Sequence, residues 1–304
     1  MERDFLSIDD LTPTELTGLL EASAAVKADR SSAATALAGL NIALIFEKPS
    51  TRTRVSFEVG IVQAGGHPVV LSASDLQLGR GETIEDTGKV LSRYVDAIVL
   101  RTFEQERLEV LAAAATVPVV NALSDFEHPC QTLADLLTVR EHKGDLSGLT
   151  MAYLGDGNNV THSLMLGCAK VGMNMKVATP PGYEPIPQIV DRASEIAAEH
   201  GATVVVTNDP EEGSAGVDVL YTDVWASMGQ EDEAGERALV FPAYQLDGAA
   251  LERANPGAIV LHCLPAHRDE EISAEVMDGP ASVVFDQAEN RLHTQKALLI
   301  SLLS

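Results

Sequence analysis

The stretch Glu47-Lys48-Pro49-Ser50-Thr51-Arg52-Thr53-Arg54 decides the fold, because an apolar run ends and a helical pattern begins there. Residues 40–46 before it are long enough for one buried strand. After it, valines recur at helical spacing until Gly65-Gly66 stops them. The first amides of that helix have no carbonyl partners and lie at the positive end of its dipole. Three hydroxyls and two guanidiniums therefore surround a place that binds phosphate or carboxylate.

The two arginines decide between an anion site and a plain helix cap. A Ser-Thr pair alone would favour the cap, with the arginines paired to surface acids. The planar fork of Arg52 can instead hold two oxygens at once. Because Arg52 and Arg54 both occur here in a very acidic chain, we interpret the stretch as an oxyanion site for phosphate.

The composition is that of a globular protein with two domains. The chain has 304 residues, of which 45% are hydrophobic, and no apolar run reaches membrane-spanning length. Met1-Glu2-Arg3-Asp4 lacks the basic start of a signal peptide, and three cysteines without metal-like spacing suit a reducing compartment. These features predict a cytoplasmic protein that binds no metal and no membrane.

The net charge of −24 restricts the partners of the chain. Acidic residues spread along its whole length, and only 7 of its 21 basic residues are lysine. The phosphates of a nucleic acid would be repelled, so we expect no nucleic-acid partner. A lysine-poor acidic surface is typical of a protein that works in molar salt, which screens self-repulsion. An ordinary acidic cytosolic protein is the alternative, and we favour the salt-loving host.

Beyond the first strand, strand and helix patterns alternate, which predicts an α/β fold of two doubly wound domains with parallel sheets. Lys143-Gly144 closes a long helix, so we place the first domain at residues 1–144 and the second at 145–285. The pattern alone would allow an apolar helix at residues 295–303 to dock on either domain. The other expected elements are a capped helix from Ser7 toward Arg30 and strands at residues 69–71, 97–101, 117–121, 149–154, 175–178, 203–207, 217–221 and 258–261.

Polar residues follow several of these strands, and ligands of open parallel sheets gather beyond such carboxyl ends. Arg101 follows one strand and is a second candidate anion ligand. His128-Pro129-Cys130-Gln131 opens the long helix, where a histidine and a glutamine can donate hydrogen bonds to a carbonyl oxygen. A helix cap is an equally good interpretation of His128 alone.

Three later strand ends carry unusual residues. Gly155-Asp156-Gly157-Asn158-Asn159 resembles a dinucleotide loop only weakly, because the third glycine is missing. The second, Asp223-Val224-Trp225, contains the only tryptophan, and the third is His262-Cys263-Leu264-Pro265. A lone Cys263 is a nucleophile, a hydrogen-bonding group or buried packing, and we favour packing. A nucleophile would want an adjacent base, whereas His262 should point to the other face of its strand.

Four motifs in this order resemble the carbamoyltransferase family, and within it the ornithine carbamoyltransferases, over nearly the whole chain. The likeness is carried by Ser50-Thr51-Arg52-Thr53-Arg54 and His128-Pro129-Cys130-Gln131 for carbamoyl phosphate, by Asp223-Val224-Trp225 with Ser227-Met228-Gly229 for ornithine, and by His262-Cys263-Leu264-Pro265, which completes the site. Chance agreement of all four is implausible.

The resemblance implies an N-terminal domain for carbamoyl phosphate, a C-terminal domain for the amino acid, and a final helix, about residues 286–304, that returns to the first domain. It implies that the carbamoyl group passes to the side-chain amine of L-ornithine, giving L-citrulline and phosphate, without a cofactor or a metal. It also implies a homotrimer or a higher assembly of trimers, in which Gln77 reaches into a neighbouring subunit's site. Whether the reaction serves arginine synthesis or breakdown stays open.

The resemblance also assigns roles to individual residues. The phosphate would be held by Ser50, Thr51, Arg52, Thr53 and Arg101. The carbamoyl oxygen would be polarised by Arg101, His128 and Gln131, with Arg291 and the Cys263-Leu264 backbone closing around it. Ornithine would be held by Asn159, Asp223, Ser227 and Met228. The side-chain amine must lose a proton before it attacks, and Asp223, Cys263 and the leaving phosphate are the candidates to accept it.

Several alternatives remain at this point. An aspartate acceptor would want basic residues where Asp223 stands, so we disfavour it. Putrescine or another amine is the closer rival, although Ser227-Met228-Gly229 favours ornithine. A nicotinamide-dependent oxidoreductase would use Gly155-Asp156-Gly157, but it leaves residues 50–54 and Cys263 unexplained. An idle oligomeric scaffold would not need this set of polar residues.

Overall fold

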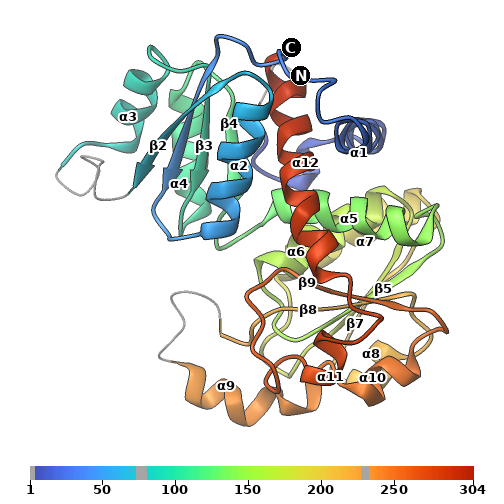
Figure 1. Cartoon of the computed structure of the whole chain (residues 1–304). Coiled ribbons are helices and arrows are strands. Elements are labelled where there is room, and N and C mark those ends of the chain that lie inside the picture. Colours follow the sequence, from blue (N-terminus) through green and yellow to red (C-terminus); the bar gives the residue numbers. More distant parts are fainter. Residues whose placement is uncertain (1–3, 73–80, 227–232) are drawn as a thin grey trace. The chain divides into compact units, whose positions relative to one another are not determined.

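The computed structural model describes residues 4–72, 81–226 and 233–304. The chain forms two compact units, each built around its own parallel sheet (Figure 1). The first unit comprises Met1–Leu137 and Glu289–Ser304, and the second comprises Thr138–Ala288. The predicted fold class, two α/β domains with parallel sheets, is confirmed.

Two long helices, α5 (Pro129–Lys143) and α12 (Val284–Leu303), join the units. The division between the units falls inside both helices, so each helix contributes residues to both. The end of α12 thereby returns the chain to the first unit, a choice that the hydrophobic pattern alone could not make. Which ligand each unit binds stays a prediction at this point.

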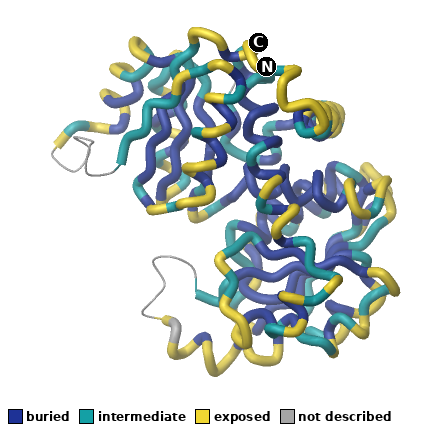
Figure 2. Tube along the Cα trace, viewed as in Figure 1, coloured by how far each residue is buried: buried dark blue, intermediate teal, exposed yellow. Residues whose placement is uncertain are grey.

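The first unit has a four-stranded sheet in the order β2-β1-β3-β4. All pairings are parallel, as expected for strands whose connections cross over through helices. Residues 42–46 of β1 are all buried, which matches the near-continuous apolar run expected of a strand covered on both faces (Figure 2). The elements of this unit are β1 (Asn41–Phe46), β2 (His67–Ser72), β3 (Ala97–Arg101), β4 (Val119–Leu123), η1 (Ile8–Asp10), α1 (Pro13–Ala28), α2 (Thr51–Gln63), α3 (Ile84–Leu91) and α4 (Gln105–Ala114).

The second unit has a five-stranded parallel sheet in the order β7-β6-β5-β8-β9. Its core contains a cluster of buried aliphatic side chains from β5, β8 and β9, together with Tyr244 and Val284. The elements are β5 (Thr150–Leu154), β6 (Asn174–Ala178), β7 (Val204–Thr207), β8 (Val219–Thr222), β9 (Ile259–His262), α6 (Asn159–Lys170), α7 (Pro187–Glu199), α8 (Pro210–Ser214), α9 (Ala234–Val240), η4 (Phe241–Tyr244), α10 (Gly248–Arg253) and α11 (Ala274–Met277).

Each sheet has one point where the strand order reverses. In the first unit, β1 lies between β2 and β3, and in the second, β5 lies between β6 and β8. The connections that follow the two strands at such a point run in opposite directions, which opens a crevice at the carboxyl ends of these strands. Ligands of open α/β sheets usually bind in this crevice. The stretch after Phe46 and the one after Leu154 start at these two points.

The N-terminal segment differs from its prediction. Ser7 caps only the short helix η1, and a second cap, Thr12, begins α1. In both cases the residue three positions on is acidic and bonds back to the cap, so the sequence holds two capping boxes where we expected one helix. Among the residues that the structure describes, no helix is both long and apolar enough to cross a membrane.

Candidate active site

The start of α2 has the cap that the sequence predicted. Ser50 is the N-cap, with an extended backbone, and its Oγ accepts a hydrogen bond from the Thr53 amide at 3.3 Å. This bond takes one of the free amides of the first turn and leaves the others available to an anion. Thr51 and Arg52 are exposed beside them, and Arg52 makes no ion pair with any described residue. Arg54 is turned to Glu58, 2.7 Å away on the surface of α2.

Arg291 of α12 brings the two predicted carbamoyl phosphate motifs of the first unit together. Its Nη2 donates to Thr53 Oγ1 at 2.8 Å, and its Nη1 donates to Gln131 Oε1 at 2.7 Å. Arg291 is only 4% exposed. Gln131 in turn donates to Asp135 Oδ1 at 2.8 Å, which fixes its amide orientation. Three residues from distant parts of the sequence thus form one buried polar cluster.

Gln295, one turn further along α12, supports the same guanidinium. With its amide oriented to satisfy both ends, it donates to Ser56 Oγ and accepts from Nη2 and Nε of Arg291, both at 3.1 Å. The sequence analysis missed Gln295 and Asp135, because each lies four residues from a predicted site residue inside an ordinary helical pattern. Only the helix spacing, which puts residues four apart on one face, could have drawn attention to them.

Arg101 ends β3 beside the start of the phosphate stretch. The carbonyl of Arg101 accepts from the Glu47 amide at 2.9 Å. The pairing of β3 with β4 shifts register between Leu100 and Arg101. Such an irregularity re-aims the side chain at its position, which is common beside active sites. The carboxylate of Glu47 bonds Thr102 and Arg107 and anchors this corner of the sheet.

Burial shifts the pKa values of His128 and Cys130, with different consequences for their chemistry. Burial, together with the positive charges of Arg291 and Arg101, holds the pKa of His128 well below its ordinary value. The imidazole is therefore neutral and can donate one hydrogen bond through its single N–H. Burial raises the pKa of the Cys130 thiol to about 12, and this thiol bonds the Asn121 carbonyl. Cys130 is thus a packing residue, because only a thiolate is a good nucleophile.

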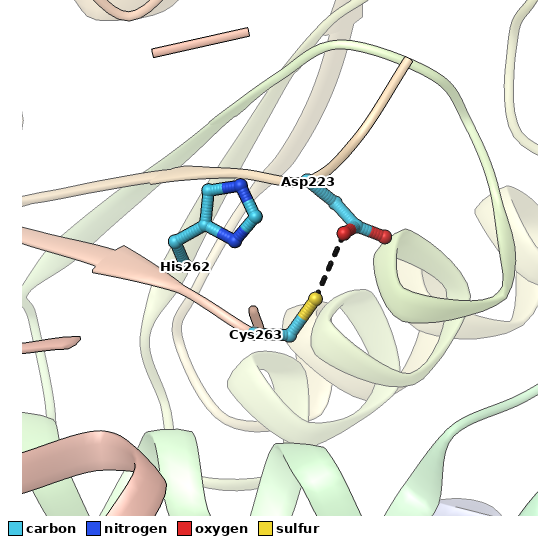
Figure 3. Close-up of side chains that lie close together, drawn as sticks. All are labelled: Asp223, His262 and Cys263. Atoms are coloured by element: carbon cyan, nitrogen blue, oxygen red, sulfur yellow. Dashed lines mark hydrogen bonds between the residues drawn. The ribbon is translucent and has the colours of Figure 1, made fainter. Parts of the chain in front are cut away.

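In the second unit, Asp223 and Cys263 meet at the ends of β8 and β9 (Figure 3). Cys263 Sγ donates to Asp223 Oδ1 at 2.9 Å. The other carboxylate oxygen accepts from Asn158 Nδ2 at 3.1 Å. The preference for Cys263 as plain packing was wrong, since its thiol makes a polar contact and is partly accessible.

The prediction that His262 points away from Cys263 was also wrong. β9 ends at His262, so the alternation of a strand no longer applies to the next residue. The chain turns at Leu264, whose φ is +61°, and the Leu264 amide donates back to His262 Nδ1 at 2.9 Å. The ring therefore shares the neighbourhood of Asp223 and Cys263, with ligand-type atoms of all three within 4.8 Å of one another (Figure 3).

Both ring nitrogens of His262 have hydrogen-bond partners, so neither is left to bind a metal ion. Its Nδ1 accepts from the Leu264 amide, and its Nε2 lies 3.1 Å from Glu271 Oε1 with both side chains fully buried. The donor set of Asp223, His262 and Cys263 is therefore occupied by internal hydrogen bonds. His262 instead shapes the turn that carries the Cys263-Leu264 backbone.

Asn158 contacts Asp223, a contact that the sequence analysis did not foresee. Asn158 is the N-cap of α6, and its Oδ1 also accepts from the Val160 and Thr161 amides at 3.0 and 3.2 Å. Asn159 is the first residue of that helix and is half-buried. Its assignment to ornithine stays a prediction. The assignments of Gln77, Ser227 and Met228 fall outside the described residues.

The glycine loop of the second unit fits packing better than a dinucleotide. A Cβ on Gly157 would lie within 2.6 Å of backbone atoms of residues 183–185. The carboxylate of Asp156 points to Arg237, whose Nη1 lies 2.7 Å from it. Gly157 is therefore required for close packing, and Asp156 is a buried acid, so this turn does not favour the binding of a pyrophosphate.

The chain thus consists of two α/β units, one with arginines and hydroxyls at a helix start and one with a carboxylate beside a thiol at two strand ends. Family models for "Aspartate/ornithine carbamoyltransferase, carbamoyl-P binding domain" and "Aspartate/ornithine carbamoyltransferase, Asp/Orn binding domain" match residues 3–141 and 147–302. The chain belongs to the aspartate/ornithine carbamoyltransferase family.

Individual relatives agree with that membership. The chain is 62% identical to an ornithine carbamoyltransferase of Parafrankia, over 99% of this chain and 96% of the relative. It is 58% identical to one of Anoxybacillus flavithermus, with the same coverage. Among solved structures, ornithine carbamoyltransferase from Pyrococcus furiosus has a TM-score of 0.95 at 51% identity, covering 98% of this chain and 96% of the other.

Proposed function

We propose that the chain transfers the carbamoyl group from carbamoyl phosphate to the side-chain amine of L-ornithine, giving L-citrulline and phosphate. The observation that carries the acceptor is the buried Asp223 carboxylate beside Cys263 at the switch point of the second sheet. An anionic centre attracts a substrate whose reacting group is an ammonium and repels a dicarboxylate such as aspartate. Relatives named ornithine carbamoyltransferase support the same acceptor.

Carbamoyl phosphate binds at the start of α2 in this proposal. Ser50, Thr51, Arg52 and Thr53 hold the phosphate together with Arg101, because free helix amides and arginine forks both favour its oxygens. His128, Gln131, Arg101 and Arg291 act on the carbamoyl oxygen, with the Cys263 and Leu264 backbone. The contacts of Arg291 with Thr53 and Gln131 support this assignment, because they hold both motifs in one cluster before any ligand arrives.

The attacking amine must first lose a proton, because an alkyl ammonium has a pKa of about 10.4. Asp223 receives this proton directly or through the Cys263 thiol, which already donates to it. The neutral amine then forms a bond to the carbamoyl carbon, and the negative charge moves to the carbonyl oxygen beside Arg101, His128 and Gln131. When that charge returns, the bond to phosphate breaks, and phosphate leaves with the electron pair and takes the second proton of the attacking nitrogen, which gives the neutral product.

A trimer of this chain, or an assembly of trimers, would complete the site. An apolar stripe on α2 supports self-association: Val55, Val59 and Val62 lie on one face of the helix and are all exposed. This stripe belongs to the same helix whose first turn carries the phosphate residues. In the trimer, Gln77 of one subunit reaches the carbamoyl phosphate of its neighbour.

The chain works in a salt-rich cytoplasm in this proposal. Its net charge of −24 with only seven lysines supports the halophilic reading, since a surface of that charge repels itself in dilute salt. The absence of disulfides among its three cysteines is compatible with a reducing compartment.

Citrulline formation by the purified chain tests the function. We expect citrulline from carbamoyl phosphate and L-ornithine, more of it in molar than in dilute KCl, and no carbamoylated product from aspartate or putrescine. Product from putrescine or aspartate would keep the phosphate site and overturn the acceptor. A folded protein that carbamoylates none of the three amines would overturn the function itself. Nicotinamide-cofactor titration of the same sample checks the oxidoreductase alternative, for which we expect no binding.

A further inference from the structure

Arg237 of α9 carries a buried guanidinium that contacts three parts of the second unit. Its side chain donates from Nη1 to Asp156 Oδ2 at 2.7 Å and to the Trp225 carbonyl at 2.6 Å. Its Nε donates to Glu233 Oε2 at 3.0 Å. Arg237 is 4% exposed. One side chain therefore links the chain just after Asp223, the start of α9 and the turn that follows β5.

Aromatic rings surround this guanidinium. Its Cζ lies 4.9 Å from the ring centroid of Tyr183 and 5.6 Å from that of Phe241. Phe241 in turn packs against Trp225, with centroids 6.0 Å apart, and against Tyr183 at 4.8 Å. Two rings thus lie at the guanidinium, and the ring of the only Trp in the chain packs on one of them. A cation between ring faces and away from water is held more firmly than one on the surface.

The contact with Asp156 connects Arg237 to the acceptor carboxylate. Asp156 precedes Gly157 and Asn158, and Asn158 donates to Asp223. Burial raises the pKa of Asp156, and the charge of Asp223 acts in the same direction. A buried carboxylate such as Asp156 is stabilised by a neighbouring cation. Arg237 supplies that cation to Asp156.

We infer that Arg237 is a positioning residue for the acceptor site, which pairs with Asp156 and holds the Trp225 carbonyl so that Asp223 keeps its place for the substrate amine. This inference rests on the proposed function and deepens it. In this inference, kcat/KM for ornithine depends on Arg237 although this side chain contacts neither substrate. The carbamoyl phosphate residues of the first unit should be indifferent to it.

The test compares Arg237→Met, Arg237→Lys and a matched control, Arg253→Met, with the wild-type chain. Arg253 also pairs with a glutamate of the second unit, Glu211 at 2.7 Å, but on the surface. We expect Arg237→Met to lower kcat/KM for ornithine roughly 10- to 100-fold, the usual effect of a displaced binding group. KM for carbamoyl phosphate should stay within about twofold, since uniform loss would instead indicate general damage. Arg237→Lys should recover part of the loss, because lysine keeps the charge but lacks the fork.

Trp225 offers a readout that does not depend on activity. It is the only tryptophan, so acrylamide quenching of its fluorescence reports on the contact with Arg237. We expect stronger quenching in Arg237→Met and wild-type quenching in Arg253→Met. Unchanged quenching together with unchanged kcat/KM for ornithine in Arg237→Met would overturn the inference.

The double variant Asp156→Asn/Arg237→Met covers the case in which the single variant fails to fold, because it removes the buried charge that Arg237 compensates. In this folded protein the contact with the Trp225 carbonyl is still missing, so kcat/KM for ornithine should remain low. Recovery to the wild-type value would show that Arg237 is only a counter-ion, which contradicts the inference. If the wild-type chain makes no citrulline, the proposed function fails by itself, and Trp225 quenching alone decides the role of Arg237.

Discussion

Two arginines of the first unit differ in exposure, and the difference predicts different roles. Arg291 is buried and donates to Thr53 and Gln131, so we expect it to organise the proposed site before substrate binds. Arg52 is exposed at the start of α2 and has no ion-pair partner among the described residues. A guanidinium without an internal partner can give its whole fork to an incoming phosphate.

Arg52→Ala should therefore nearly abolish citrulline formation without unfolding the chain. Loss of one such charge-stabilising donor typically costs about 10²–10³-fold in rate. The free energy of unfolding should change by no more than about 0.5 kcal/mol, as for other exposed positions. Steady-state kinetics and urea unfolding of the same sample measure both. Arg30→Ala, which removes a surface ion pair with Glu289, is the control. Wild-type turnover in folded Arg52→Ala would contradict the phosphate assignment.

A second prediction at this scale concerns the thiol beside Asp223. Cys263→Ser keeps a donor to the carboxylate but raises the pKa of the relay group, so kcat should fall by up to about 10²-fold. Folding should be unaffected, because the side chain is partly exposed. Cys168→Ser is the contrasting control, since that thiol is buried and should lose stability instead. A rise in KM for ornithine with unchanged kcat in Cys263→Ser would exclude a relay.

The sequence identified most of these residues but not their partners. Strand ends and helix starts are local features, so residues 50–53, Arg101, Asp223 and Cys263 could be selected from patterns alone. Asn158 and Arg237 could not, because their function depends on contacts with residues far along the chain, Asp223 and Asp156. Arg237 in particular lies in an acidic stretch that looks like an ordinary solvated surface.

At the scale of elements, the turn between β5 and α6 depends on one glycine. Gly157 has no room for a Cβ, which would meet the Pro185 nitrogen at 2.3 Å and the Glu184 carbonyl carbon at 2.5 Å. Both neighbours are backbone atoms and cannot rotate away. The turn therefore fixes the N-cap Asn158 and, through it, Asp223.

Gly157→Ala should destabilise the chain and disturb the acceptor site together. Overpacking against backbone costs about 3 kcal/mol or more in free energy of unfolding. Gly18→Ala is a control of opposite sign: Gly18 is exposed inside α1 with nothing within 4 Å of its Cβ position, so alanine should stabilise by about 0.5–1 kcal/mol. Urea unfolding of both variants measures the difference. Equal stability of the two would show that residues 183–185 yield to the extra methyl group.

Elements were predicted well where one local signal dominates and poorly where two compete. β1 and β3 carry unbroken apolar runs, and their observed bounds match the expected ones closely. α5 starts at Pro129, inside the stretch His128-Pro129-Cys130-Gln131 that we expected to open it, although this helix is buried nearly all round and shows no amphipathic pattern in its first turn. The end of α12 belongs to the first unit because of tertiary contacts, which a local sequence pattern does not contain.

The whole molecule carries a charge that its fold does little to neutralise. Some exposed carboxylates are neighbours on one helix, as Glu106 and Glu109 are at a spacing of three residues on α4. Like charges at this spacing destabilise a helix by about 0.2–0.5 kcal/mol per pair. Repulsion of this kind, summed over a net charge of −24, opposes folding in dilute salt and weakens as salt is added.

The thermal midpoint of unfolding should therefore rise steeply between about 0.05 M and 1 M KCl, as the screening length falls from over 10 Å to about 3 Å. Glu109→Lys turns one repulsive pair into an attractive one, so it should raise the midpoint in dilute salt and have little effect in molar salt. Glu109→Gln, which removes the repulsion alone, should lie between them. Calorimetry in KCl and in an equal concentration of sucrose separates screening from a general solute effect. A midpoint that rises equally in sucrose, or a Glu109→Lys shift that persists in molar salt, would exclude self-repulsion as the cause and with it the main physical argument for a halophilic chain.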